Sequence, residues 1–369
     1  MAARLRGAAP LAADGGWWNH EPPRLKPGVE VIMKRGCQLK HWPIILMVVA
    51  TGCTSQPTDQ PHPAGGPQAT AQGVEKEGYV DAGSGVRLFY RLLGTGGDPV
   101  ILIHGGPGLT SDYLADDMAP MARSRSVFIY DQRGIGKSTL VSDSTGLAAQ
   151  RYVEDLEAIR KHLGLEQLTL LGHSWGAAPA ALYAMQYAHR VRRMILVGTI
   201  PFRRSELVAA FQTLAASRDS VTQRRMTELS RIRQANPSDL SACQEYYRLW
   251  FTPFFAAPRT PDSMKGNVCA GSPASLTNKQ FVDRFTFPSL GDWDWTTSLR
   301  SATTPTLIIH GELDPLPIES ARKWATAMPN ARLLELKGIG HFPYVEAPDT
   351  FFAAINRFLQ GDWPEATTR

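Results

Sequence analysis

A serine flanked by small residues is the first position in this chain whose type and surroundings could do chemistry. The segment GHSWG (172–176) follows an apolar run and precedes an Ala-rich stretch of helical character. A nucleophile on a tight strand-to-helix turn needs tiny residues two positions to either side, because the turn is strained and backbones approach closely there. The positive end of the following helix would lie beside the serine. This pattern predicts that Ser174 is a nucleophile.

A second segment could stabilise the negative charge that attack by Ser174 develops. The segment HGGPG (104–108) ends another apolar run. Glycines at such a position let a backbone N–H face the reacting carbonyl. We therefore expect the N–H groups of Gly106 and Trp175 to form an oxyanion hole. A plain Gly/Pro turn is the alternative interpretation of HGGPG.

An acid and a base follow late in the chain. Asp314 lies in HGELDP (310–315), and His341 lies in GHFP (340–343) after the last apolar run. A serine, then an acid, then a histidine is the chain order of α/β-hydrolases. His341 would take the serine proton, and Asp314 would hold the imidazole in the required tautomer. Glu312 is the competing acid.

The elements that must position these residues alternate between strand and helix. Continuous apolar runs, typical of strands covered on both faces, alternate with helical patterns, which predicts a mostly parallel sheet flanked by helices. Between residues 200 and 296 the alternation stops, and a helical, aromatic-rich segment predicts a cap, with most of its aromatic residues packed in the interior. The expected strands are 86–93, 100–105, 126–131, 168–172, 193–198, 306–311 and 332–336, and the expected helices are 151–163, 175–187, 320–328 and 350–359.

Together these motifs resemble a known family. HGGPG, DQRGIGKS (131–138), GHSWG, GELDP and GIGH are similar to the prolyl aminopeptidase (proline iminopeptidase) branch of the α/β-hydrolases, over residues 78–365 and including DWDWT (292–296). The resemblance implies an α/β-hydrolase fold with a mostly parallel central sheet, flanking helices and an inserted helical cap. It also implies a serine hydrolase without metal or cofactor that releases N-terminal residues, typically Pro, from short peptides.

Two departures keep a second function open. Acidic side chains hold the substrate amine in this branch, whereas here Pro315 follows the predicted triad acid and Arg284 stands in the cap where some relatives carry an acid. Glu228 or Glu245 could substitute, but the sequence does not place them. An esterase, lactonase or amidase on the same scaffold needs no such acid and is the alternative.

The N-terminal region predicts export. Residues 33–52 combine Lys34 and Arg35, a short apolar stretch and small residues before Cys53, which resembles the lipobox of bacterial lipoproteins, with Ala50 where Leu is more usual. We expect a signal peptide at 33–52, lipidation of Cys53 and a flexible tether at 53–76 that links a membrane anchor to the catalytic domain. An ordinary signal peptide or a buried strand is the alternative. Residues 1–32 have no signal character, and Met33 is a candidate start.

Charge and cysteine content complete the picture. The 369 residues carry a net charge of +5, but residues 1–52 hold seven Lys/Arg against three Asp/Glu, so the remainder is nearly neutral and no basic face indicates nucleic-acid binding. Cys243 and Cys269 remain as a pair that either forms a disulfide in an oxidising compartment or stays as two buried thiols.

The strand and helix pattern predicts a catalytic core at 77–199 and 297–369 and a cap at 200–296. The N-terminal segment predicts location in a bacterial cell envelope.

Overall fold

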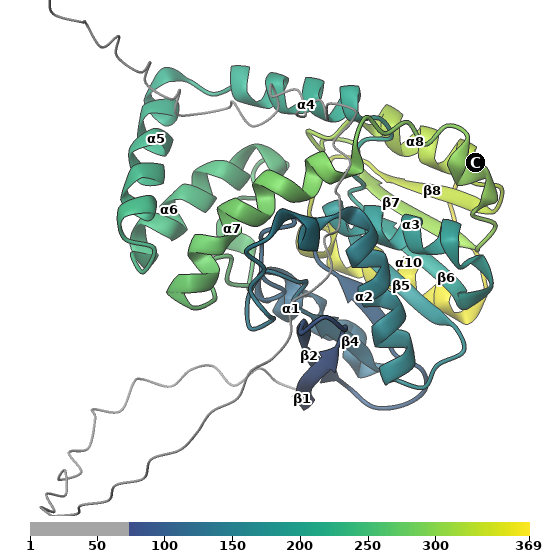
Figure 1. Cartoon of the computed structure of the whole chain (residues 1–369). Coiled ribbons are helices and arrows are strands. Elements are labelled where there is room, and N and C mark those ends of the chain that lie inside the picture. The colour runs from purple at the N-terminus through teal and green to yellow at the C-terminus, as the bar shows by residue number, and fades with distance from the viewer. Residues whose placement is uncertain (1–73) are drawn as a thin grey trace, which may run out of the picture. The chain divides into compact units, whose positions relative to one another are not determined.

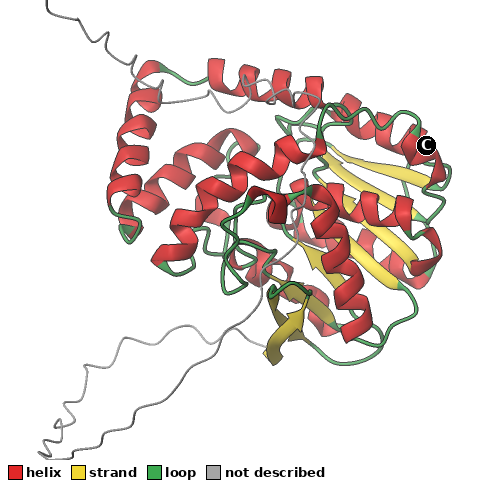
Figure 2. Cartoon of the chain, in the orientation of Figure 1, coloured by secondary structure: helices red, strands yellow, loops and turns green. Residues whose placement is uncertain are grey.

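The computed structural model describes residues 74–369, so the uncertain leader, the predicted signal peptide and Cys53 lie outside the described residues. The described chain forms an eight-stranded sheet with helices on both faces and a group of helices at one side (Figures 1 and 2). The predicted mostly parallel sheet, flanked by helices and carrying a helical insertion, is confirmed. Every helix within residues 74–369 is too short or too polar to cross a lipid bilayer.

The strands lie in the order β1-β2-β4-β3-β5-β6-β7-β8. Neighbours β1–β2 and β2–β4 are antiparallel, and all other neighbouring pairs are parallel. The seven predicted strands are present, with ends shifted by two residues at most. The strands are β1 (Val74–Asp81), β2 (Arg87–Leu93), β3 (Val100–Ile103), β4 (Val127–Tyr130), β5 (Leu168–His173), β6 (Val191–Val197), β7 (Thr306–Gly311) and β8 (Ala331–Leu336).

Strand β1 is the one strand of the described sheet that the sequence did not indicate. It begins at Val74, inside the segment predicted as tether, and pairs along β2 at the edge of the sheet. Its sequence VEKEGYVD has no apolar run, because an edge strand with a solvent-exposed side needs none. Residues 74–76 of the predicted tether therefore belong to the sheet.

Helices cover both faces of the sheet. On one face Leu156 of α2, Ala181 of α3 and Trp324 of α8 pack in a common core, and on the other Met118 of α1 and Ile355 of α10 do so. Burial on both faces explains why β3 and β4 are unbroken apolar runs. These helices are α1 (Asp112–Met118), α2 (Ala149–His162), α3 (Ala177–Gln186), α8 (Ile318–Ala327), α9 (Pro343–Glu346) and α10 (Pro348–Gln360).

Four helices of the insertion, coloured teal to green in Figure 1, form the cap: α4 (Arg204–Ala216), α5 (Ser220–Ala235), α6 (Leu240–Phe251) and α7 (Pro273–Thr286). Side chains of Asp219, Asp239 and Ser272 accept hydrogen bonds from the first turns of α5, α6 and α7, which fixes where these helices begin. The prediction that most cap aromatic residues pack inside is confirmed. The buried ones are Phe202, Tyr247, Phe251, Phe254, Phe255, Trp293 and Trp295.

A disulfide joins Cys243 of α6 to Cys269, which precedes α7, with 6.0 Å between their Cα atoms. Both residues are buried. Of the two alternatives for this pair, the structure has the disulfide. The disulfide links α6 to the segment that leads into α7.

Candidate active site

Ser174 lies on a strained turn between β5 and α3. Its φ is +55°, a left-handed conformation that residues other than glycine rarely adopt. The two flanking glycines are required by contact, because a Cβ on Gly172 would collide with the carbonyl of Gly176, and one on Gly176 with that of Ile103. Ser174 is half-buried, whereas Trp175 beside it is fully buried. The turn therefore leaves the Ser174 side chain partly exposed on a closely packed backbone.

The HGGPG loop runs directly against this turn. A Cβ on Gly105 would lie 2.8 Å from the Cβ of Ser174. The next residue, Gly106, has a φ of +46°, which glycine adopts without strain. The loop follows β3, the strand beside β5, so the ends of two neighbouring parallel strands bring Gly106 and Ser174 together.

The predicted base and acid are hydrogen-bonded to each other. His341 Nδ1 lies 2.6 Å from Asp314 Oδ2, and both residues are buried. The second oxygen of Asp314 accepts a hydrogen bond from the backbone N–H of Leu316 (2.8 Å). Glu312, the competing acid, instead pairs with Lys337 near the surface (3.1 Å). The geometry thus leaves Nε2 of His341 as the nitrogen that can take a proton.

A chain of hydrogen bonds connects the three segments. The N–H of Gly105 donates to Tyr113 Oη (2.8 Å), which lies 2.6 Å from His173 Nδ1, and His173 Nε2 lies 3.2 Å from the carbonyl of His341. Since the carbonyl of His341 can only accept, His173 Nε2 carries the ring proton, and Nδ1 of the neutral ring accepts from the hydroxyl of Tyr113. Burial lowers the pKa of His173 well below its usual value, and the nearby His341 lowers it further. The His173 ring is therefore uncharged and connects Tyr113 to the backbone of His341. The centroids of the His173 and His341 rings lie 4.9 Å apart.

Residues of the DQRGIGKS motif form buried hydrogen bonds with the segments around the candidate site. Asp131 accepts hydrogen bonds from the N–H and the hydroxyl of Ser111 (2.9 and 2.8 Å). Arg133 forms a buried two-point ion pair with Asp155 of α2 (2.8 and 2.5 Å). Between them, Gln132 reaches His104 and Trp175 (2.7 and 3.0 Å). Sequence reasoning used this motif for recognition and assigned Gln132 no role.

Comparison with known proteins identifies the fold family. The family model described as the alpha/beta hydrolase fold matches residues 98–348. This chain is an alpha/beta hydrolase. It is 28% identical over 298 residues to the proline iminopeptidase of Heyndrickxia coagulans, a match that covers 77% of this chain and 98% of that protein.

Solved structures share the fold of this hydrolase. The proline iminopeptidase of Mycobacterium smegmatis aligns with a TM-score of 0.58 and 24% identity, over 77% of this chain and 98% of that one. An esterase from Exiguobacterium antarcticum aligns with a TM-score of 0.57 and 19% identity, over 77% of this chain and 99% of that one. At these identities the likeness shows the fold alone.

The cap of the hydrolase brings one acid to the HGGPG loop. Asp283 of α7 accepts a hydrogen bond from the N–H of Gly108 (3.1 Å) and pairs with the nearly buried Lys279 (2.7 Å). The sequence singled out the neighbouring Arg284 and not Asp283, because only the fold shows which side of α7 faces the loop. The two acids considered as substitutes, Glu228 and Glu245, both pair with Arg225 elsewhere in the cap (2.9 and 2.5 Å).

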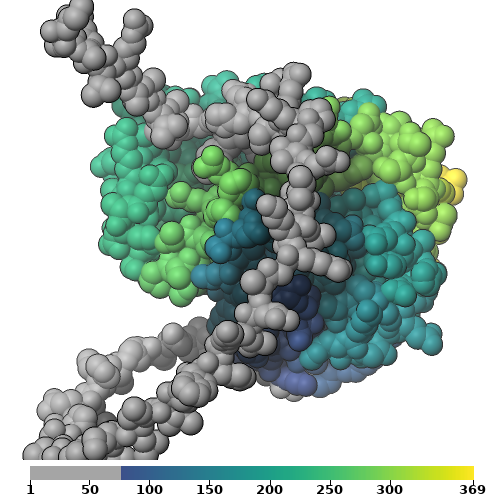
Figure 3. Space-filling view, in the orientation of Figure 1, coloured from purple at the N-terminus to yellow at the C-terminus, as the bar shows by residue number. Residues whose placement is uncertain are grey.

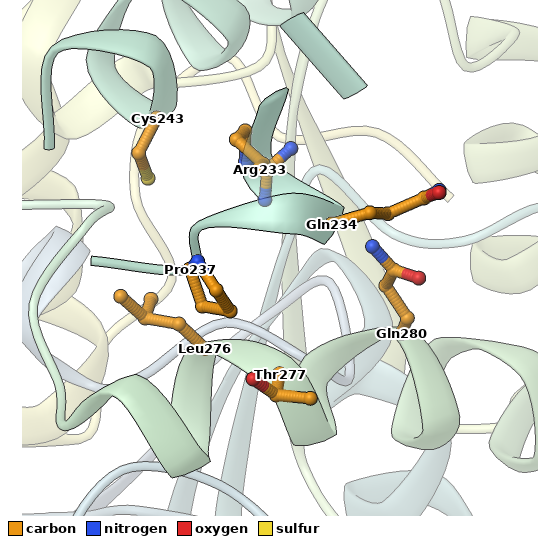
Figure 4. Close-up of a pocket in the computed structure, with 7 residues that line it drawn as sticks. All are labelled: Arg233, Gln234, Pro237, Cys243, Leu276, Thr277 and Gln280. Carbon is orange, nitrogen blue, oxygen red and sulfur yellow. The ribbon is translucent and has the colours of Figure 1, made fainter. Parts of the chain in front are cut away.

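The cap also contains a hollow of its own. A pocket of about 90 Å³ lies between α5, α6 and α7, and Arg233, Gln234 and Gln280 surround it (Figure 4). None of Ser174, Asp314 and His341 lines it. The other side of α7 contacts the core, where Asn278 donates to the carbonyl of Gly134 (2.7 Å), and the green α7 borders the blue core segment in Figure 3.

Proposed function

We propose that this hydrolase uses Ser174, His341 and Asp314 as a catalytic triad to release N-terminal residues, proline preferred, from short peptides. The observation that carries the proposal is the His341–Asp314 pair, held beside the strained turn of Ser174 and the HGGPG loop. The near full-length match to a proline iminopeptidase supports the substrate class.

The proposed reaction passes through an acyl-enzyme. Ser174 Oγ attacks the carbonyl carbon of the first residue while His341 Nε2 takes the serine proton. The backbone N–H groups of Gly106 and Trp175 would stabilise the oxyanion. The C–N bond then breaks, His341 returns the proton to the leaving amine, and a water molecule hydrolyses the ester by the same route. Asp314 stabilises the imidazolium in both halves.

Asp283 is the described acid best placed to bind the substrate amine. It touches Gly108 of the oxyanion loop, and its side chain is about one-third exposed (37%). A substrate ammonium would have to share Asp283 with Lys279 or displace it, and displacement would leave the nearly buried Lys279 without an anion. In this proposal, Asp283 takes the role of the acids that some relatives carry at the positions of Pro315 and Arg284.

One observation favours the alternative of an ester or amide substrate without a free amine. Asp283 already has a cation in Lys279, and Glu228 and Glu245 already share Arg225. If Lys279 keeps Asp283, no acid in the described part of the cap is left for a substrate amine near Gly108. The aminopeptidase and the esterase or amidase candidates therefore differ in whether Asp283 binds a substrate amine or only Lys279.

Turnover of three substrates separates these candidates. A prolyl anilide, its N-blocked form and a short-chain nitrophenyl ester would be compared with the purified protein. The proposal expects cleavage of the free-amine anilide and little cleavage of the blocked one. Ester cleavage alone would overturn the aminopeptidase proposal. Ser174→Ala should abolish all turnover without unfolding the protein, and retained activity would refute Ser174 as the nucleophile.

Asp283→Asn tests the amine site directly. Asn keeps an oxygen to accept from Gly108 but loses the charge, so we expect KM for the free-amine anilide to rise roughly 10- to 100-fold, the range for a lost charged hydrogen bond. Ester turnover should change little. Glu228→Gln is the matched control, because it removes an acid of the same cap away from the loop. An equal effect on ester and anilide would contradict amine binding by Asp283.

We also propose that the protein is a lipoprotein of a bacterial cell envelope. The support is the basic, apolar and small-residue pattern of residues 33–52 followed by Cys53. The cap disulfide adds support, since disulfides persist mainly in oxidising compartments. On this proposal substrates are short peptides or esters outside the cytoplasm.

A further inference from the structure

We infer that Gln132 is a positioning residue that sets the spacing between the two backbone donors of the oxyanion hole. The inference rests on the proposed function, because the hole itself is part of that proposal. Gln132 lies two residues after the last residue of β4 and is completely buried. Both polar atoms of its side-chain amide are hydrogen-bonded, as buried polar groups generally are.

The side chain of Gln132 bridges the two segments that supply the donors. Its Nε2 donates to the carbonyl of His104 (2.7 Å), two residues before Gly106. Its Oε1 accepts from the indole N–H of Trp175 (3.0 Å), whose own backbone N–H is the second donor. One planar amide thus spans the gap between the end of β3 and the turn after β5.

A second contact makes the link to the β3 loop rigid. The backbone N–H of Gln132 donates to His104 Nε2 (3.1 Å), so the other ring nitrogen of His104 carries the proton and donates to the carbonyl of Gly105 (3.0 Å). Burial lowers the pKa of His104, which keeps this arrangement neutral. Gln132 therefore holds His104 by both its backbone and its ring.

Only an amide fits this position. The His104 carbonyl needs a donor, and the Trp175 indole needs an acceptor, at the two ends of one short side chain. Leucine offers neither, and glutamate would place a negative oxygen against a carbonyl. Because an oxyanion hole works only when its donors are preorganised, a small change in their spacing lowers the rate without removing either donor.

The test is the second-order rate at which a fluorophosphonate labels Ser174, since the phosphoryl oxygen of the adduct occupies the oxyanion hole whatever the natural substrate. We expect Gln132→Leu to slow labelling roughly 10- to 100-fold. Ser138→Ala is the matched control: Ser138 is a buried, hydrogen-bonded residue of the same motif that contacts the carbonyl of Asp131 and the N–H of Phe89 instead. This variant should label within about threefold of wild type at a similar loss of stability.

A double-mutant cycle separates positioning from simple destabilisation. Trp175→Phe keeps the buried ring and the backbone donor but removes the indole N–H, so it should slow labelling as well. If both residues act through one bridge, the double variant Gln132→Leu/Trp175→Phe labels no more slowly than Gln132→Leu alone. KM for whichever substrate is turned over should stay near wild type while kcat falls.

The outcomes separate the inference from the proposed function. Absence of labelling in wild type would refute the serine mechanism itself. Normal wild-type labelling with Gln132→Leu within threefold of it would overturn the inference about Gln132, as would fully additive effects in the cycle. If Gln132→Leu fails to fold, Trp175→Phe alone decides: labelling at the wild-type rate would overturn the inference.

Discussion

At the scale of residues, the candidate site contains buried histidines that stay neutral beside the residues proposed to move protons. His104 is the first residue of the HGGPG loop and His173 precedes Ser174, and each ring accepts one hydrogen bond and donates another. Their buried rings connect segments that are far apart in the sequence. A charge on either ring would break this pattern, because a protonated imidazole has no acceptor nitrogen.

This neutrality predicts acid sensitivity between pH 7 and 5. The folded state keeps His173 neutral because burial lowers its pKa, whereas the unfolded chain binds a proton below about 6.5, so stability falls as pH falls through that value. This loss of stability grows as the pH falls further, until the folded-state histidine itself binds a proton. Thermal unfolding of His173→Gln should show a smaller decrease than wild type. The exposed control, His189→Gln, should follow wild type, and identical curves for all three proteins would contradict the assignment.

Asp314 gives a second prediction at this scale. Asp314→Asn keeps the shape of the pair with His341 but favours the wrong imidazole tautomer, so we expect kcat to fall by roughly 10⁴ with little change in folding. Glu312→Gln serves as the comparison, since Glu312 pairs with Lys337 instead. If the Glu312 variant lost more activity than the Asp314 variant, Glu312 would be the triad acid.

At the scale of elements, the cap depends on links between helices as well as on its core. The disulfide closes a loop of 26 residues between α6 and the start of the segment leading into α7. Helix α7 in turn contacts the core through Ser275, whose hydroxyl accepts from the N–H of Gly136 (2.7 Å). The contact of Asp283 with Gly108 of the HGGPG loop therefore depends on the contacts that fix α7 against the core.

Removing the disulfide should loosen this arrangement. Cys243→Ala/Cys269→Ala is expected to lower the free energy of unfolding by about 3 kcal/mol, the chain-entropy estimate for a loop of this length. Chemical denaturation with and without a reducing agent measures it, because reduction should destabilise the wild type and leave the double variant unchanged. Equal sensitivity of both proteins to the reductant would show that the bond is not formed.

At the scale of the whole molecule, the proposed anchor and the catalytic unit are separate parts of one chain. The catalytic unit begins with β1 at Val74, and the proposed lipid site lies outside the described residues. Nothing in the proposed chemistry needs the anchor. Location and turnover should therefore be separable by mutation.

Cys53→Ser tests this separation. We expect the protein to move from the membrane fraction to the soluble fraction while the kcat of the purified enzyme stays the same. Cys37→Ser, within the predicted signal, is the matched control and should leave the protein in the membrane fraction. Membrane retention of the Cys53 variant would contradict lipidation at that residue.

The sequence by itself determined the parallel strands and the residues at their ends. Apolar runs covered on both faces carry a strong local signal, and the carboxyl ends of parallel strands meet at one edge, so Ser174 and Gly106 could be expected together. Strand β1 escaped prediction because an exposed edge strand carries no such signal. The cap was predictable as helical and aromatic, but not in its packing.

Only the tertiary structure decided which side chains meet across long sequence separations. It paired His341 with Asp314 rather than Glu312, joined Cys243 to Cys269, and brought Asp283 to the oxyanion loop. These contacts depend on the angle at which helices and loops pack, which no local pattern encodes. Gln132 illustrates the limit: its motif was visible, but its role follows from two partners that only the folded sheet brings within reach.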